Sequence, residues 1–102
     1  MAKGDHLKLT FRPELADFVR LQHDNARDRW VLQAPERVLV LDTTGKEIVD
    51  RFDGKTSLDE IIQALVAEYD APRDVIDHDV RAVVGLLEEK RFLRAEADNG
   101  KD

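Results

Sequence analysis

Apolar residues alternate with polar ones in the first forty positions of the chain and recur at helical spacing in the rest. The alternation predicts three short strands, at residues 18–22, 30–33 and 37–41, because successive side chains of a strand point to opposite faces. Polar residues 23–29 form the first predicted connection, and residues 34–36, which include a proline, form the second. Short connections between neighbouring strands favour a three-stranded antiparallel meander.

The third predicted strand is apolar on both faces. Val38 and Val40 point to one face, and Leu39 and Leu41 point to the other. An antiparallel sheet with one face in water normally carries polar residues on that face. Two interpretations are compatible with this strand: helices cover both faces, or one side is free to receive another molecule.

Three helices are predicted after the strands. Thr44 and Glu47 have the spacing of a capping box, and so do Ser57 and Glu60. Apolar residues at helical spacing follow each box, and a third helix is expected from about residue 73 to about residue 90. The predicted fold is therefore α+β and winged-helix-like, with a three-stranded antiparallel sheet followed by three helices.

The third predicted helix carries more apolar surface than one core contact needs. A first stripe, assigned to the core, consists of Ile76, Val80, Val83 and Leu87. A second stripe, offset by roughly a quarter turn at about 100° per residue, consists of Val75, Ala82 and Leu86. The opposite side is predicted to carry Asp77, His78, Arg81, Gly85 and Glu88. The second stripe belongs either to the core or to a groove beside the sheet.

The 102 residues are enough for one small domain, predicted at residues 12–94. Residues 1–11 and 95–102 are polar or small for the most part and are expected to be flexible tails. No apolar run exceeds four residues, so no membrane-spanning helix or signal-peptide core is expected. Cysteine is absent, which excludes disulfides and thiolate chemistry and fits a cytoplasmic protein.

The charge of the chain argues against nucleic acid, a common partner of winged-helix-like domains. The net charge is −6, and the third predicted helix has two basic and five acidic residues between positions 74 and 90. A helix that enters the major groove needs positive charge facing phosphate. A nucleic-acid-binding domain is therefore kept only as an alternative function, beside a subunit of an uncharacterised enzyme.

Nothing in the sequence indicates a catalytic, metal or cofactor site. His6 lies in the predicted tail, His23 in a turn and His78 on the polar side of a helix, so the three histidines are not expected to converge. No pair of histidines has the four-residue spacing of a helical zinc site. The glycines are isolated from one another, so no phosphate-binding loop is expected. We expect no enzyme activity, no cofactor and no metal.

Two runs resemble the PqqD family. They are residues 34–45, Ala-Pro-Glu-Arg-Val-Leu-Val-Leu-Asp-Thr-Thr-Gly, and residues 52–62, Phe-Asp-Gly-Lys-Thr-Ser-Leu-Asp-Glu-Ile-Ile. Pro13 and residues 20–24 also match, so the resemblance covers roughly residues 12–93. Phe52 departs from the family pattern, in which many members carry a cysteine before Asp-Gly, and this is a packing change.

The resemblance implies a peptide chaperone of pyrroloquinoline quinone biosynthesis that has no catalysis of its own. Such proteins bind the ribosomally made precursor peptide PqqA and present it to the radical SAM enzyme PqqE. In such proteins the leader peptide adds a strand to the third strand and lies against the third helix. This agrees with the place of the third strand at the edge of the predicted meander and with the second stripe of the third helix. A leader peptide of another modified-peptide pathway is an alternative ligand. The chain is expected to be a monomer or weak dimer that binds neither nucleic acid nor membrane, and it is compatible with a portion of a natural fusion.

Ten residues follow as the predicted peptide-binding site: Arg37, Val38, Leu39, Val40, Leu41, Val75, Asp79, Ala82, Val83 and Leu86. Asp79 is expected to meet a basic residue of the leader peptide, and Arg37 an acidic one.

Overall fold

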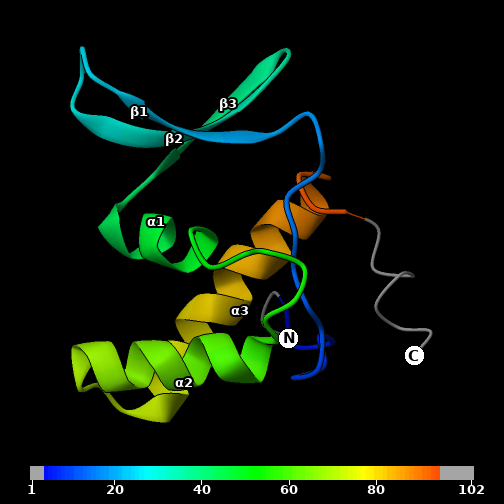
Figure 1. The fold of residues 1–102 in the computed structure, drawn as a ribbon, viewed down its shortest axis with the longest axis vertical. Coiled ribbons are helices and arrows are strands. Elements are labelled where there is room, and N and C mark those ends of the chain that lie inside the picture. The colour runs from blue at the N-terminus through cyan, green and yellow to red at the C-terminus, as the bar shows by residue number, and fades with distance from the viewer. Residues whose placement is uncertain (1–3, 95–102) are drawn as a thin grey trace.

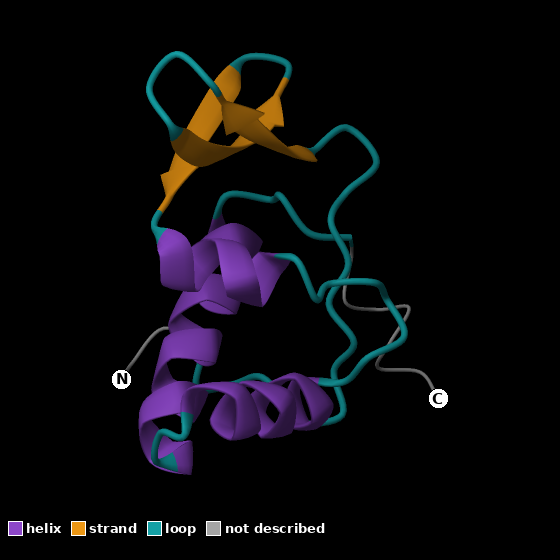
Figure 2. Ribbon diagram, turned by 60° about the vertical axis from the view of Figure 1, so that its left-hand side comes forward, coloured by secondary structure: helices purple, strands orange, loops and turns teal. Residues whose placement is uncertain are grey.

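The structure is a computed structural model that describes residues 4–94. Three antiparallel strands are followed by three helices, which confirms the predicted α+β architecture (Figure 1). The sheet lies at one end of the molecule and α2 (Leu58–Tyr69) at the other, with α3 (Arg73–Glu89) running between them (Figure 2). No helix among residues 4–94 combines the length and the apolar character needed to cross a bilayer.

The sheet is an antiparallel meander in the order β1 (Arg20–Asp24), β2 (Arg29–Ala34), β3 (Arg37–Leu41). The third strand has the predicted bounds, but the first begins two residues later than predicted. The reason is a turn at residues 16–19, closed by the Val19 amide donating to the Ala16 carbonyl at 3.0 Å. One row across the sheet pairs Leu21, Leu32 and Leu39, and this row faces the helices.

Two of the predicted helix starts are confirmed and one is wrong. Ser57 and Glu60 form the predicted capping box of α2, and α3 begins at Arg73. The first helix, α1 (Thr43–Val49), is not capped by Thr44, because Asp42 is its N-cap and accepts a hydrogen bond from the Gly45 amide at 2.7 Å. An aspartate at the end of β3 therefore starts this helix two residues earlier than the Thr44 box predicts.

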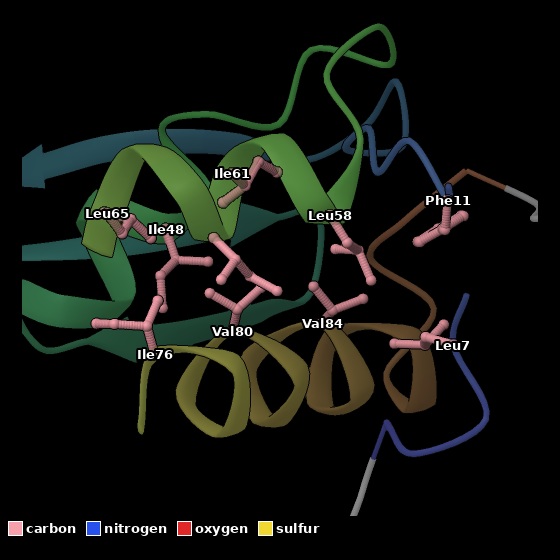
Figure 3. Packing of buried hydrophobic residues seen from close by; sticks show 10 residues of the cluster. Leu7, Phe11, Ile48, Leu58, Ile61, Leu65, Ile76, Val80 and Val84 are labelled. Carbon is pink, nitrogen blue, oxygen red and sulfur yellow. The ribbon is translucent and has the colours of Figure 1, made fainter. Parts of the chain in front are cut away.

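The buried apolar residues form two clusters that share α3. The first joins α1, α2, α3 and the N-terminal segment, with Ile61, Leu65 and Val80 among its members (Figure 3). The second joins the sheet to the C-terminal end of α3 through Leu32, Leu87 and Phe92. Three partly buried residues touch both clusters: Phe52, Val83 and Leu93. Phe52 thus packs between the two clusters.

The packed domain begins before residue 12, where the sequence analysis placed its boundary. Leu7 and Phe11 are buried in the first cluster. The Arg81 guanidinium donates to the carbonyls of Gly4, at 3.1 Å, and Leu7, at 2.6 Å. Two apolar residues spaced among charged ones were too weak a signal to predict this packing. Positions 1–3 and the predicted tail 95–102 lie outside the described residues.

We expect Leu7→Ala to lower the free energy of unfolding by about 2–5 kcal/mol, as truncation of a buried leucine usually does. Leu7 is 3% exposed, whereas Leu9, two positions away, is 38% exposed. Leu9→Ala is therefore the matched control and should cost less than about 1 kcal/mol. Urea unfolding followed by circular dichroism measures both values. Equal small costs would show that the N-terminal segment does not pack as described.

Candidate functional site

β3 is an edge strand on the side facing away from β2. The loop between β2 and β3 has two residues, Pro35 and Glu36, so Ala34 and Arg37 pair directly across it. An edge strand presents a row of unpaired backbone N–H and C=O groups that another strand can bind. The side chains of Val38 and Val40, 52% and 49% exposed, stand on the outer face of this edge.

The inner face of β3 is only partly free. Leu41 is buried and Leu39 is half-buried, and both pack with the second cluster. The two apolar faces of the strand therefore have different roles, which resolves the ambiguity left by its sequence. The leucines hold the strand on the domain, and the valines remain exposed to solvent.

Arg37, predicted to meet an acidic residue of the leader peptide, has partners within the domain. Its guanidinium donates to the Lys90 carbonyl at 2.7 Å and lies 4.6 Å from the centroid of the Phe92 ring. This carbonyl is at the C-terminal end of α3, where basic side chains are favoured by the helix dipole. Arg37 thus positions the start of β3 beside the end of α3.

The residues of the predicted second stripe differ in burial along the length of α3. Ala82 and Leu86 are half-buried in its C-terminal half, while Val75 is exposed near its start. Val83, assigned from the sequence to both the core stripe and the border of the groove, is half-buried and touches both clusters. Its expected place in the core is taken by Val84, which is fully buried.

The side of α3 predicted to face water is partly covered by the N-terminal segment. Gly85 is buried, and Asp77 and Arg81 are half-buried and pair at 2.8 Å. His6 bonds to Glu88 at 2.8 Å on the same side. The second stripe is therefore left as the partly open side of this helix.

The structure thus brings the predicted site residues into two neighbouring places. The edge of β3 and the C-terminal half of α3, with Ala82, Val83 and Leu86, form the first. Val75 and Asp79 lie toward the start of α3 and line a hollow of about 180 Å³ with residues of α1, α2 and their connections. The α1 and α2 residues of this hollow, such as Thr44 and Tyr69, were not predicted from the sequence, because their spacing alone does not place them beside α3.

The basic and aromatic residues of the first hairpin do not form a nucleic-acid platform. Arg27 and Arg29 pair with Asp24 at 3.6 Å and 3.3 Å. Trp30 is covered by Lys46, 4.7 Å from its ring centroid, and contacts His23 edge-on. The hydrogen bond between His23 and Asn25, helped by the nearby Asp28 carboxylate, raises the pKa of His23. These charges are neutralised within the hairpin.

Among residues 4–94, no group of three or more histidine, aspartate or glutamate side chains lies close enough to hold a metal ion. His6 bonds to Glu88, and His23 bonds to Asn25 and Asp28, so these two histidines have separate partners in different parts of the fold. The features that stand out are an open strand edge, an apolar helix face and a hollow, which suit binding.

Comparison with known proteins agrees with this geometry. The family model described as Coenzyme PQQ synthesis protein D (PqqD) matches residues 29–93. The PqqA binding protein of Xanthomonas euvesicatoria pv. vesicatoria (strain 85-10) is 49% identical over 83 residues, which cover 81% of this chain and 90% of that protein.

Two solved structures share the fold. One is the solution NMR structure of the PqqD truncation of Methylobacterium extorquens PqqCD, described as a functional, stand-alone RiPP recognition element, RiPP denoting a ribosomally synthesized and post-translationally modified peptide. It has a TM-score of 0.70 and 35% identity, and the match covers 81% of this chain and 88% of that one. The other is TbiB1 in complex with the TbiA(beta) leader peptide, with a TM-score of 0.68, 26% identity and coverage of 80% and 95%.

Three antiparallel strands followed by three helices give this chain the fold of a RiPP recognition element, which it shares with the PqqD truncation. Within this class, the chain belongs to the PqqD family, since the family model spans more than half of its length.

A charge placed at either of two adjacent leucines of α3 should affect folding very differently. Leu87 is fully buried, so Leu87→Asp places an unpaired charge in the second cluster. We expect a cost of several kcal/mol, which is comparable to the roughly 5–15 kcal/mol of a domain's total stability, and therefore an unfolded protein. Leu86 is half-buried on the open side, so Leu86→Asp should keep a folded circular-dichroism spectrum and a cooperative melting curve. Unfolding of both variants would assign Leu86 to the core.

Proposed function

We propose that this chain binds the PqqA precursor peptide by strand addition, with the peptide paired to the free edge of β3 and its inward side chains against α3. The observation that carries the proposal is the unpaired edge of β3, a strand joined to the C-terminal end of α3 by the bond from Arg37 to the Lys90 carbonyl. Leu39 of β3 and Val83 of α3 also pack on the same cluster, and Ala82 and Leu86 are half-buried beside Val83. The name of the Xanthomonas relative and the leader-peptide complex of TbiB1 support this choice of ligand class.

The register of the hairpin indicates which backbone groups bind the peptide. In an antiparallel hairpin with a two-residue loop, the residues that flank the loop form a hydrogen-bonded pair, and such pairs then alternate along the strands. The pairs Ala34–Arg37, Leu32–Leu39 and Trp30–Leu41 therefore use their N–H and C=O groups between β2 and β3. The N–H and C=O groups of Val38 and Val40 point outward, toward the proposed peptide.

The main chain of β3 supplies affinity for the peptide, and side chains of α3 supply selectivity. Main-chain pairing at Val38 and Val40 is independent of the peptide's sequence and supplies a general affinity for extended chains. Alternate side chains of an added strand would face α3, where Leu86 and Val83 select apolar residues. Arg37 contributes by fixing the strand against the helix, since its guanidinium is bonded to Lys90.

In this role the chain presents the peptide and does no chemistry on it. We propose PqqE, a radical SAM enzyme, as the enzyme that receives the peptide, and the cytoplasm as the place of action. We also propose that the chain is a monomer or weak dimer. Binding to nucleic acid is disfavoured, because α3 carries five acidic and only two basic residues between positions 74 and 90.

Proline substitutions at neighbouring positions of β3 should have unequal effects, because proline removes a backbone N–H. Val40→Pro deletes an N–H that points to the free edge. We expect this variant to stay folded and to bind a synthetic PqqA peptide at least tenfold more weakly, about 1.4 kcal/mol. Leu39→Pro deletes an N–H bonded to β2 and should lower the melting temperature or unfold the domain. Fluorescence anisotropy with a labelled peptide and thermal melting measure the two effects.

Val40→Thr is the matched control, since it keeps the backbone N–H and the branched shape of the side chain. It should bind within about twofold of the parent protein, because its added hydroxyl lies on the exposed outer face. If Val40→Pro folds and binds PqqA as the parent does, strand addition at β3 is wrong. A different leader peptide that binds more tightly than PqqA would redirect the proposal to another pathway.

A further inference from the structure

The hollow at the start of α3 is large enough for one side chain of a bound peptide. Its volume is about 180 Å³, and engineered apolar cavities of about 150 Å³ take up benzene. Ile48 of α1, Leu65 of α2 and Ile76 of α3 converge on it (Figure 3). Val75, which is about half exposed, also lines it and lies toward the solvent. The walls are therefore largely apolar, and an aliphatic chain can pack against them.

One carboxylate, that of Asp79, lines this apolar space. Asp79 is half-buried and has no hydrogen-bond or ion-pair partner within residues 4–94. The other carboxylate of the same helical turn, Asp77, is paired with Arg81 at 2.8 Å on the side covered by the N-terminal segment. Asp79 is thus the acidic group of α3 left available to a ligand in the hollow.

The charges around the hollow also favour a cation. Desolvation, together with the nearby carboxylates of Glu47 and Glu68, raises the pKa of the Tyr69 hydroxyl at the rim. The two basic residues near this hydroxyl are themselves engaged. Lys46 pairs with Glu47 at 3.7 Å and with Asp50 at 3.4 Å, and Arg51 pairs with Glu68. Among the described residues that line the hollow, Asp79 is the one charged side chain, and neither lysine nor arginine lines it.

The hollow lies where a peptide on β3 would extend beyond the strand. Thr44 lines it and follows Leu41, the last residue of β3, by three positions. Asp79 precedes Ala82 and Val83 by about one helical turn, so the hollow and the proposed peptide groove share one side of α3. An occupant of the hollow is therefore most simply a residue of the same bound peptide.

We propose that this hollow receives a long basic side chain, lysine or arginine, of the bound precursor peptide. The aliphatic stem packs against Ile48, Leu65 and Val75, and the cationic end pairs with the Asp79 carboxylate. Long basic side chains commonly combine burial of the stem with a charge at the surface. The inference rests on the proposed function, because it supposes that the peptide lies between β3 and α3.

The test uses the full chain and synthetic PqqA peptides in which each lysine or arginine in turn is replaced by norleucine. Norleucine keeps the aliphatic stem and removes the charge. We expect one replacement to weaken binding about 3- to 10-fold, and Asp79→Asn to weaken binding of the unmodified peptide by a similar factor. When both changes are combined, the second should have no further effect, as a double-mutant cycle shows for groups in contact.

Asp74→Asn is the matched control, because Asp74 is an exposed carboxylate of the same helix outside the hollow. It should bind within about twofold of the parent protein, and melting curves should show that both variants are folded. A second measurement needs no variant: raising NaCl from 50 to 500 mM should remove the difference between the unmodified peptide and the critical norleucine peptide.

The outcomes distinguish the two levels of the proposal. If the parent protein does not bind PqqA at all, the proposed function fails, and the inference fails with it. If PqqA binds but Asp79→Asn matches Asp74→Asn, the function stands and the basic-side-chain site is wrong. Full additivity of Asp79→Asn with every norleucine replacement overturns the site as well.

Discussion

The way in which α3 ends holds the helix against the sheet, and the proposed peptide-binding surface depends on this packing. Arg91 has a φ of +63°, a left-handed conformation that turns the chain back at the helix end. The Phe92 amide donates to the Leu87 carbonyl at 2.9 Å and the Arg91 amide to the Glu88 carbonyl at 3.0 Å, which is the pattern of a Schellman motif. The reversal delivers Phe92 into the second cluster, where Arg37 lies over its ring.

With its C-terminal end held in this way, α3 has three different environments around it. Its buried residues hold both clusters together, and its Arg81 side binds the N-terminal segment through backbone carbonyls. The remaining side of the helix, which carries Asp79, Ala82 and Leu86, is only half-buried. Because core burial fixes the helix on two sides, the third can keep apolar residues half exposed without loss of structure. A binding surface prepared in this way needs little reordering when a ligand arrives.

The sequence predicted the features that are governed by local patterns. A short apolar run after the turn at Pro35 located β3, and the Ser57 capping box and the helical periodicity located α2 and α3, because these signals are local. Packing between elements was harder to predict. The apolar spacing of α3 does not show whether Val83 or Val84 is the buried residue, because the answer depends on the N-terminal segment that covers the neighbouring side. The packing of that segment was not predictable, because Leu7 and Phe11 are too few to form a recognisable pattern. The edge position of β3 was predictable from the order of the strands, whereas the hollow depends on α1 and α2 meeting α3, which the spacing of residues does not show.

The length of the two-residue loop, Pro35 and Glu36, sets the register in which β3 pairs with β2. Side chains alternate with a period of two, so a shift of one residue in β3 would exchange its faces. Leu39 and Leu41 would then point to solvent, Val38 and Val40 would point to the second cluster, and the outward backbone groups would belong to the other set of residues. Changes in the residues of this loop leave both faces in place, but a single inserted or deleted residue alters the core and the free edge together. Length variation among relatives is therefore expected to avoid this loop and to concentrate in connections that do not set a register.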